Sequence, residues 1–147
     1  MYQRILIATD GSALSRKAVR SGIQLATLTD ALVVALKVVP RYPVSYFEGG
    51  MSVANKDVAR IEKQWAEDAL AVVEAVKADA EASGLKAKAV TTSSDLIAES
   101  IIATAKKHKC DLIVMASHGR RGIKRLLLGS ETTQVLTHSH IPVLVLR

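Results

Sequence analysis

The chain has 147 residues, of which 49% are hydrophobic, and it carries a formal net charge of +6. This length and apolar content fit one domain with a full hydrophobic core, spanning residues 1–147. Neither a charged-then-apolar leader nor an uninterrupted apolar run of about 18 residues is present, so we predict a cytosolic protein with no membrane partner. The positive charge favours acidic partners, but it does not choose among a nucleotide, a nucleic acid and none.

Short apolar runs alternate along the chain with segments of helical period. Strands are predicted over 4–9, 32–39, 87–92, 112–116 and 143–146, and helices over 12–28, 55–83, 95–108 and 130–137. Such alternation is typical of α/β domains with an open parallel sheet. In the first helix, small residues recur every four positions at Ala18, Gly22 and Ala26, which gives a face able to lie close against the sheet.

Three residues are predicted to mark helix ends. Ser94 and Ser130 are expected to cap the starts of the third and fourth helices, because a serine hydroxyl accepts hydrogen bonds from the unpaired amides there. Gly84 stands where a left-handed C-terminal cap of the second helix belongs.

The segment from 40 to 54 has two prolines, paired glycines and no sustained period, which indicates a long loop. Its aromatic residues either fold over a ligand or a partner, or pin the loop to the body of the domain. These residues are Tyr42, Tyr46 and Phe47.

The single cysteine, Cys110, precedes a buried strand and follows the basic run 106–109. An intramolecular disulfide is impossible with one cysteine, so a reduced, partly buried thiol is predicted. The alternative is redox chemistry, because neighbouring cations could lower the pKa of the thiol.

The segment from Met115 to Ser130 carries most of the functional information. It combines the turn Ser117-His118-Gly119, four cations and a Gly129-Ser130 helix start, directly after a run typical of a strand buried on both faces. Glycines let backbone N–H groups approach an anion, and the first turn of a helix presents unpaired amides. The segment therefore predicts a turn that binds phosphate.

These residues resemble the signature of the universal stress protein family. In nucleotide-binding members it reads glycine, two residues, glycine, nine residues, glycine, then serine or threonine; this chain matches with Gly119, Gly129 and Ser130, and has Ala116 at the first position. The resemblance covers nearly the whole chain, since residues 4–12, 33–38 and 141–146 are similar to the family's first, second and last strands. It implies a single-domain, Rossmann-like open sheet of five parallel strands in the order 3-2-1-4-5, with helices on both faces.

The resemblance implies that ATP or a related adenine nucleotide binds at the carboxyl ends of strands one and four. Asp10 would hold the ribose or a Mg²⁺ ion bound to phosphates, or would only stabilise a helix start. Val38 would read the adenine edge through its backbone, and Gly119 and Gly129 would let amides approach phosphate oxygens. The expected nucleotide-binding residues are Ala8, Thr9, Asp10, Val38, Met115, Ala116, Ser117, His118, Gly119, Arg120, Gly122, Gly129, Ser130, Glu131 and Thr132.

The implied role is a stress-response sensor or regulator with at most slow ATP hydrolysis, because no general base is evident. No catalytic and no metal-binding residue is assigned, and His118 is expected to be a turn residue. The chain has no Gly-x4-Gly-Lys-Ser/Thr loop and no Gly-x-Gly-x-x-Gly, which excludes standard P-loop ATPases and dinucleotide oxidoreductases. The alternative is an interaction protein that keeps the fold without the nucleotide, which Ala116 and the acidic Glu131 favour.

The resemblance also implies a homodimer in which the edge strand Val143–Leu146 pairs across a two-fold axis. An apolar edge strand is an aggregation risk unless it is paired, so physical reasoning agrees with this expectation. Nucleic acid is the least favoured partner, because the basic segments lack interleaved aromatic residues and match no recognisable module. These segments are 106–109 and the cations Arg120, Arg121, Lys124 and Arg125.

Overall fold

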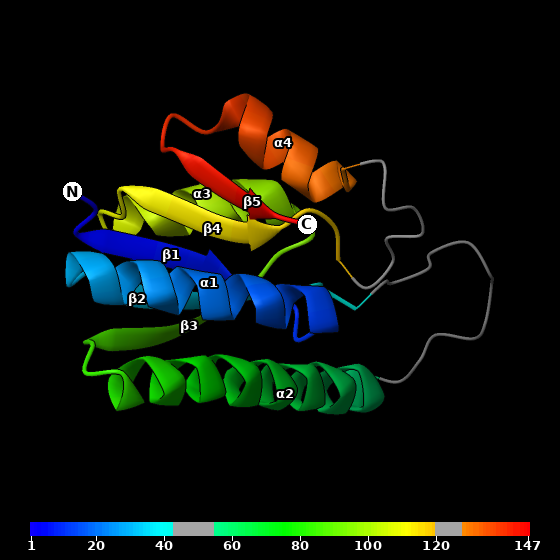
Figure 1. Cartoon of the computed structure of the whole chain (residues 1–147). Helices are drawn as coiled ribbons and strands as arrows, with labels where there is room; N and C mark the ends of the chain where they lie inside the picture. The colour runs from blue at the N-terminus through cyan, green and yellow to red at the C-terminus, as the bar shows by residue number, and fades with distance from the viewer. Residues whose placement is uncertain (43–54, 120–127) are drawn as a thin grey trace.

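Five parallel strands form one sheet in the order β3-β2-β1-β4-β5 (Figure 1). The structure is a computed structural model that describes residues 1–42, 55–119 and 128–147. The strands are β1 (Arg4–Ala8), β2 (Leu32–Val39), β3 (Ala87–Ser93), β4 (Leu112–Ala116) and β5 (Val143–Leu146); the helices are α1 (Ala13–Thr29), α2 (Asn55–Ala82), α3 (Ile97–Lys107) and α4 (Ser130–His138). The α/β class and the strand order are confirmed, and every predicted element is present.

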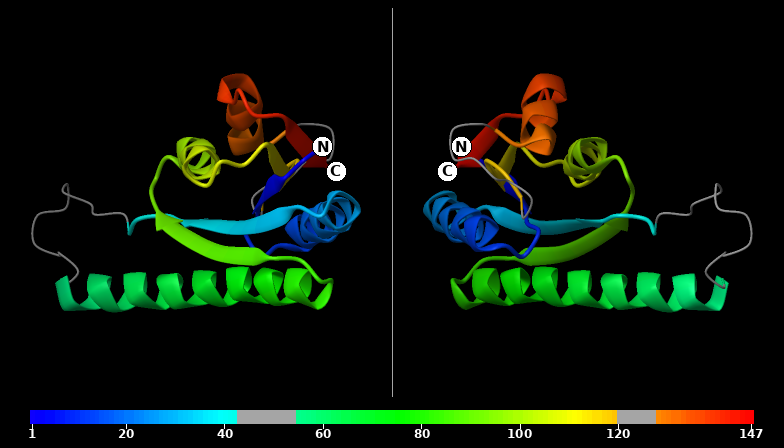
Figure 2. Two further views of the ribbon diagram at one scale, coloured as in Figure 1. Left: turned by 90° about the vertical axis from the view of Figure 1, so that its left-hand side faces the viewer. Right: turned by 90° about the vertical axis from the view of Figure 1, so that its right-hand side faces the viewer.

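Helices cover both faces of the sheet, with α1 and α2 on one face and α3 and α4 on the other (Figures 1 and 2). Side chains alternate between the two faces along each strand. In β1, Ile5 and Ile7 pack against α1 and α2, whereas Leu6 packs against α3 and α4, and all three are fully buried. Burial on both faces explains why the central strands β1 and β4 are almost entirely apolar.

The helix ends confirm one prediction and correct another. Gly84 has φ +82°, the left-handed conformation expected after α2. The N-cap of α3 is Leu96, without a side-chain cap hydrogen bond. Ser94 Oγ instead accepts from the Leu96 amide at 3.0 Å, so the serine closes the turn just before the helix. The predicted Ser94 cap is therefore wrong by two residues: the hydroxyl forms a local hydrogen bond, as short polar side chains often do.

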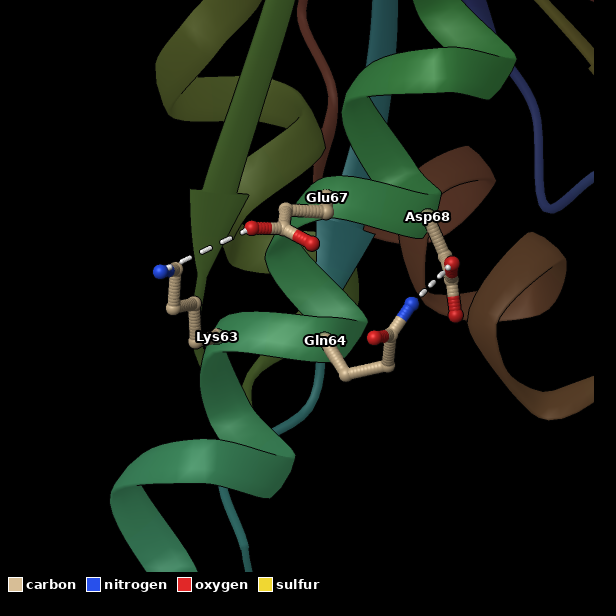
Figure 3. Close-up of polar contacts among 4 residues, drawn as sticks. All are labelled: Lys63, Gln64, Glu67 and Asp68. Carbon is tan, nitrogen blue, oxygen red and sulfur yellow. Dashed lines mark hydrogen bonds and ion pairs between the residues drawn. The ribbon is translucent and has the colours of Figure 1, made fainter.

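The long helix α2 carries charged and polar pairs along its length (Figure 3). Gln64 Nε2 donates to Asp68 Oδ1 at 2.9 Å, and Lys63 Nζ lies 4.0 Å from Glu67 Oε1. Exposed pairs of this spacing contribute only about 0.2–0.5 kcal/mol each. The helix is therefore held on the sheet by its buried apolar residues, which include Ala69, Val73, Val76 and Ala80.

Tyr42, the first aromatic residue of the segment after β2, packs against Trp65 of α2 with ring centroids 5.9 Å apart. This contact supports the interpretation that Tyr42 pins the start of the segment to the domain. Tyr46 and Phe47 lie outside the described residues. In the described parts of the chain, no helix is long and apolar enough to cross a bilayer.

Cys110 lies at the end of the α3–β4 turn and is 6% exposed. Burial raises the pKa of its thiol from 9.0 to about 11, and this effect outweighs the opposing influence of Arg4. The thiol is therefore protonated at neutral pH, as the prediction of a reduced and buried thiol requires, and the redox alternative loses its electrostatic basis.

We expect the stability of the protein to fall as the pH rises between 9 and about 11, because in that range the unfolded chain releases the Cys110 proton and the folded chain retains it. Denaturant unfolding at several pH values measures this, with Cys110→Ala as the matched variant that lacks the group. The expectation fails if the wild-type and variant lose stability in parallel across this range.

Candidate functional site at the ends of β1 and β4

The neighbouring strands β1 and β4 define a topological switch point. They pair in parallel, with Ile7 opposite Val114. β1 leads into α1 on one face of the sheet, whereas β4 leads toward α4 on the other. Open α/β sheets bind ligands in the crevice that such diverging connections create beyond the carboxyl ends of the strands.

Asp10 and Gly119 meet at this point, although they are far apart in sequence. A Cβ atom placed on Gly119 would lie 2.9 Å from Asp10 Oδ2, so a side chain at residue 119 would have to displace this carboxylate. The other carboxylate oxygen, Oδ1, accepts from the Ser12 amide at 2.9 Å. Asp10 therefore stabilises the start of α1, as one of the two interpretations of the sequence expects, and its carboxylate also faces the turn after β4. Its role toward a ligand stays a prediction.

Gly129 brings the start of α4 against the same turn. Its amide donates to Ser117 O at 2.8 Å, and a Cβ atom placed on it would lie 3.2 Å from His118 Cα. The amide of Gly129 is thus engaged within the protein. The amides that remain without a helical carbonyl partner are those of the first turn of α4, which are Ser130, Glu131 and Thr132.

The N-cap of α4 is Gly129, with φ −63° and ψ 157°, and Ser130 is the first helical residue. The predicted Ser130 cap is therefore displaced by one position. Ser130 Oγ donates to Glu131 Oε2 at 2.8 Å, and both side chains are exposed. A carboxylate in the first turn stabilises a helix N-terminus electrostatically. The same carboxylate brings negative charge to the place where phosphate binding is expected.

Thr132 fastens α4 to the end of β4. It is 2% exposed, and its Oγ1 donates to Ala116 O at 3.0 Å. The Thr132 side chain is thus committed to the protein, which leaves its backbone amide for any ligand. Ala116 itself adopts no positive φ, since the non-glycine residues with positive φ in the described parts of the chain are Asp30 and Lys109. Alanine in place of the first signature glycine therefore causes no backbone strain here.

We expect Thr132→Val to destabilise the protein by about 1–3 kcal/mol, because valine keeps the shape and leaves the buried Ala116 carbonyl without its hydrogen bond. Thr137→Val is the matched control, since the Thr137 hydroxyl also bonds a carbonyl but is exposed. Urea unfolding compares the two variants. Equal losses of stability in both variants would show that the buried hydrogen bond contributes no more to stability than the exposed one.

The remaining predicted site residues lie around this switch point. Ala8 ends β1 and Val38 is the penultimate residue of β2; both are half-buried, and Met115 is buried. Thr9 is also buried, and its hydroxyl lies 3.0 Å from Ser15 Oγ in α1, so this side chain holds α1 to β1. Arg120 and Gly122 lie outside the described residues, as do Arg121, Lys124 and Arg125. No group of three His, Cys, Asp or Glu side chains suited to a metal ion occurs in 1–42, 55–119 and 128–147.

Sequence reasoning missed Lys37, which lies beside the site. Its Nζ donates to the backbone carbonyl of Asp10 at 3.4 Å. The sequence does contain a signal for it: Lys37 is the one charged residue in the otherwise apolar segment Leu32-Val-Val-Ala-Leu-Lys-Val-Val39. A lysine there adds positive charge to the crevice.

Known proteins share this fold and sequence. The model of the universal stress protein family matches residues 1–147. The chain is 36% identical over 148 residues to Universal stress protein MJ0531 of Methanocaldococcus jannaschii, covering 100% of this chain and 83% of that protein. The solved structure of MJ0577 from the same organism superposes with a TM-score of 0.84 at 29% identity, covering 99% of this chain and 96% of that chain.

A universal stress protein solved in complex with cAMP has the same fold, with a TM-score of 0.67 at 23% identity over 99% of this chain and 97% of that chain. The strand order, the glycine turn after β4 and the full-length sequence match agree with one another. On these grounds the chain belongs to the universal stress protein family.

Proposed function

We propose that the protein binds ATP or a related adenine nucleotide at the carboxyl ends of β1 and β4, and that it acts as a cytosolic stress sensor or regulator. The observation that carries the proposal is the close approach of Gly119 to Asp10 Oδ2 at the switch point. A carboxylate suited to a ribose hydroxyl thus lies beside a turn suited to phosphate. The family relative solved with cAMP supports an adenine nucleotide as the ligand class.

In this proposal, different described residues contact different parts of the nucleotide. The first-turn amides of α4 face the phosphates, and the helix dipole adds favourable potential for an anion. Asp10 binds the ribose hydroxyls, the backbone of Val38 reads the adenine edge, and Met115 and Ala116 line the base and sugar. Mg²⁺ commonly binds through one carboxylate together with substrate phosphates and waters, and among the described residues Asp10 would hold the ion in this way.

The proposal assigns no catalytic residue. His118 Nδ1 lies 3.1 Å from Ser117 Oγ, and among the described residues no carboxylate bonds to this ring to orient it as a base. We expect hydrolysis to be slow at most, because it would depend on positioning alone. Binding with slow or no hydrolysis suits a sensor, because the bound fraction of the protein then follows the nucleotide concentration.

Calorimetric titration of the purified protein with ATP, AMP and cAMP, with and without Mg²⁺, tests the proposal. We expect at least one nucleotide to bind more tightly than 1 mM, which corresponds to about −4 kcal/mol. Asp10→Asn should weaken that binding at least tenfold, whereas Asp30→Asn, a matched change after α1, should leave it unchanged. Failure of all three nucleotides to bind would remove the proposal.

The second candidate function is a stress-related interaction protein that keeps the fold and binds no nucleotide. The exposed Glu131 carboxylate favours it, because this group takes the Ser130 hydroxyl and repels phosphate from the first turn of α4. A mass spectrum of freshly purified, denatured protein separates the two functions: a co-purified adenine nucleotide supports the first, and its absence together with a failed titration supports the second.

We also propose a homodimer through β5. Within the described residues this strand pairs with β4 on one side and with no strand on the other, so that edge presents unpaired backbone groups. Leu144 on the strand is 38% exposed. Light scattering should give the mass of a dimer at micromolar concentration, and Leu144→Lys should shift it toward the monomer. Leu28→Lys, at a leucine 85% exposed at the end of α1, should keep the dimer; a monomeric wild-type protein would contradict the proposal.

A further inference from the structure

Cations gather at the edge of the sheet where the strands begin, opposite the proposed nucleotide site. The starts of β1 and β3 and the end of α3 lie on the same side of the molecule, at the left in Figure 1. Exposed lysines occur there on two elements, and a half-buried arginine on a third. We call this set the amino-edge basic surface; it consists of Arg4, Lys86, Lys88, Lys107 and Lys109.

Strand register places two of these cations on one face. Lys88 is the register partner of Val34, which is in turn the partner of Leu6, and both apolar residues belong to the core that packs against α3. Because side chains alternate, Arg4 shares the face of Leu6. One strand separates β1 from β3, so the two cations come from strands about 10 Å apart.

The end of α3 joins the same cluster. Arg4 Nη1 donates to His108 O at 3.1 Å, which ties the start of β1 to the residue after α3. Burial lowers the pKa of His108, and the nearby charges of Lys88, Lys107 and Arg4 lower it further. Cations from three separate elements are therefore close enough to act on one imidazole.

Asp111, which precedes β4 at this edge, does not neutralise the lysines by pairing with them. Asp111 uses its oxygens to accept the amides of Gln3 and Arg4 at 2.9–3.2 Å. Side-chain ion pairs within the described ranges all lie on α2. The four lysines of the amino-edge basic surface are thus exposed and form no side-chain ion pair among the described residues.

Ordinary explanations account for only some of these residues. A cation near a helix C-terminus is stabilised by the dipole, which suits Lys107, and an edge strand is protected from aggregation by a lysine, which suits Lys88. Lys109 follows α3 with φ 56°, a left-handed conformation that favours glycine or asparagine over lysine. Arg4 has a structural role as well, since it bonds the carbonyl of His108 at the end of α3. Neither explanation accounts for the left-handed Lys109.

We propose that the amino-edge basic surface binds an acidic segment of a partner protein. Charge complementarity supports this choice of partner, because cations from three elements gather at one edge of the sheet and the lysines among them form no side-chain ion pair in the described residues. Recognition of single-stranded nucleic acid depends on aromatic platforms, and the nearby Tyr2 packs against the core on the opposite face instead. The surface lies away from the nucleotide crevice, so the two sites are independent.

Fluorescence anisotropy with a labelled peptide of ten glutamates tests the proposal on nucleotide-free protein. We expect saturable binding that weakens between 50 and 200 mM salt. The triple variant Lys88→Glu, Lys107→Glu and Lys109→Glu should weaken binding at least tenfold. Its matched control is Arg20→Glu, Lys56→Glu and Lys63→Glu, which reverses the same number of exposed charges elsewhere and should change affinity less than twofold.

Equal losses of affinity in both triple variants would show that only net charge matters, and no loss in either would place the peptide elsewhere; each outcome overturns the proposal. Duplex DNA and anionic lipid vesicles serve as competing probes in the same assay. Tighter binding of either at equal charge, lost in the first triple variant, would reassign the surface to that partner and overturn the proposal of an acidic protein segment.

Discussion

Gly129→Val is expected to weaken ATP binding at least tenfold, a loss of about 1.4 kcal/mol or more. A Cβ atom on residue 129 would lie 3.2 Å from His118 Cα and 3.4 Å from Ser117 O. These are backbone atoms of the turn after β4, which cannot move aside as the end of a side chain can. Valine adds two further carbons, so the start of α4 must separate from the turn, and the first-turn amides shift with it. Calorimetric titration with ATP measures the loss.

Gly84→Val is the control for this variant. Gly84 has positive φ and open space around its Cβ position, so valine strains the backbone far from the crevice. It should lower the free energy of unfolding and leave ATP affinity unchanged. If Gly129→Val binds ATP as tightly as the wild type while remaining folded, the amides of the α4 first turn are not the phosphate site.

The elements of the fold could be predicted because each depends on a pattern confined to a short segment. Burial on both faces makes β1 and β2 mostly apolar, and the left-handed turn after α2 requires a residue such as Gly84. The caps could not be assigned correctly from the same information. Ser94 and Ser130 each have a local donor or acceptor one or two residues away, and a sequence does not show which partner a hydroxyl takes.

The candidate site, like the fold, could be predicted only in part from the sequence. The approach of Asp10 to Gly119 could be predicted, because topology brings the carboxyl ends of adjacent parallel strands together once the strand order is given by the family resemblance. The role of the Thr132 hydroxyl could not, since it bonds a carbonyl 16 residues earlier and nothing local distinguishes it from an ordinary helix threonine. Lys37 was missed for the same reason, because its partner lies on another strand's turn.

Gly22→Val is expected to destabilise the protein by about 2–3 kcal/mol, as overpacking of a filled core does. A Cβ atom on residue 22 would lie 2.7 Å from Ile7 Cδ1 and 2.9 Å from Ile7 Cγ1, so α1 can lie this close to β1 only over a glycine. For a chain of about this size, each kcal/mol shifts the thermal midpoint by roughly 2–4 °C. Calorimetric or circular dichroism melting measures the shift.

Two further variants identify the contact responsible. Arg20→Val places the same β-branched residue on the exposed side of α1, where only helix propensity of a few tenths of a kcal/mol is at stake. Ile7→Ala removes both carbons that the added valine meets, so in the double variant the cavity and the extra volume compensate each other. The double variant should be more stable than the sum of the single losses by about 1 kcal/mol or more. Additive losses would mean that Gly22 is required for a reason other than its contact with Ile7.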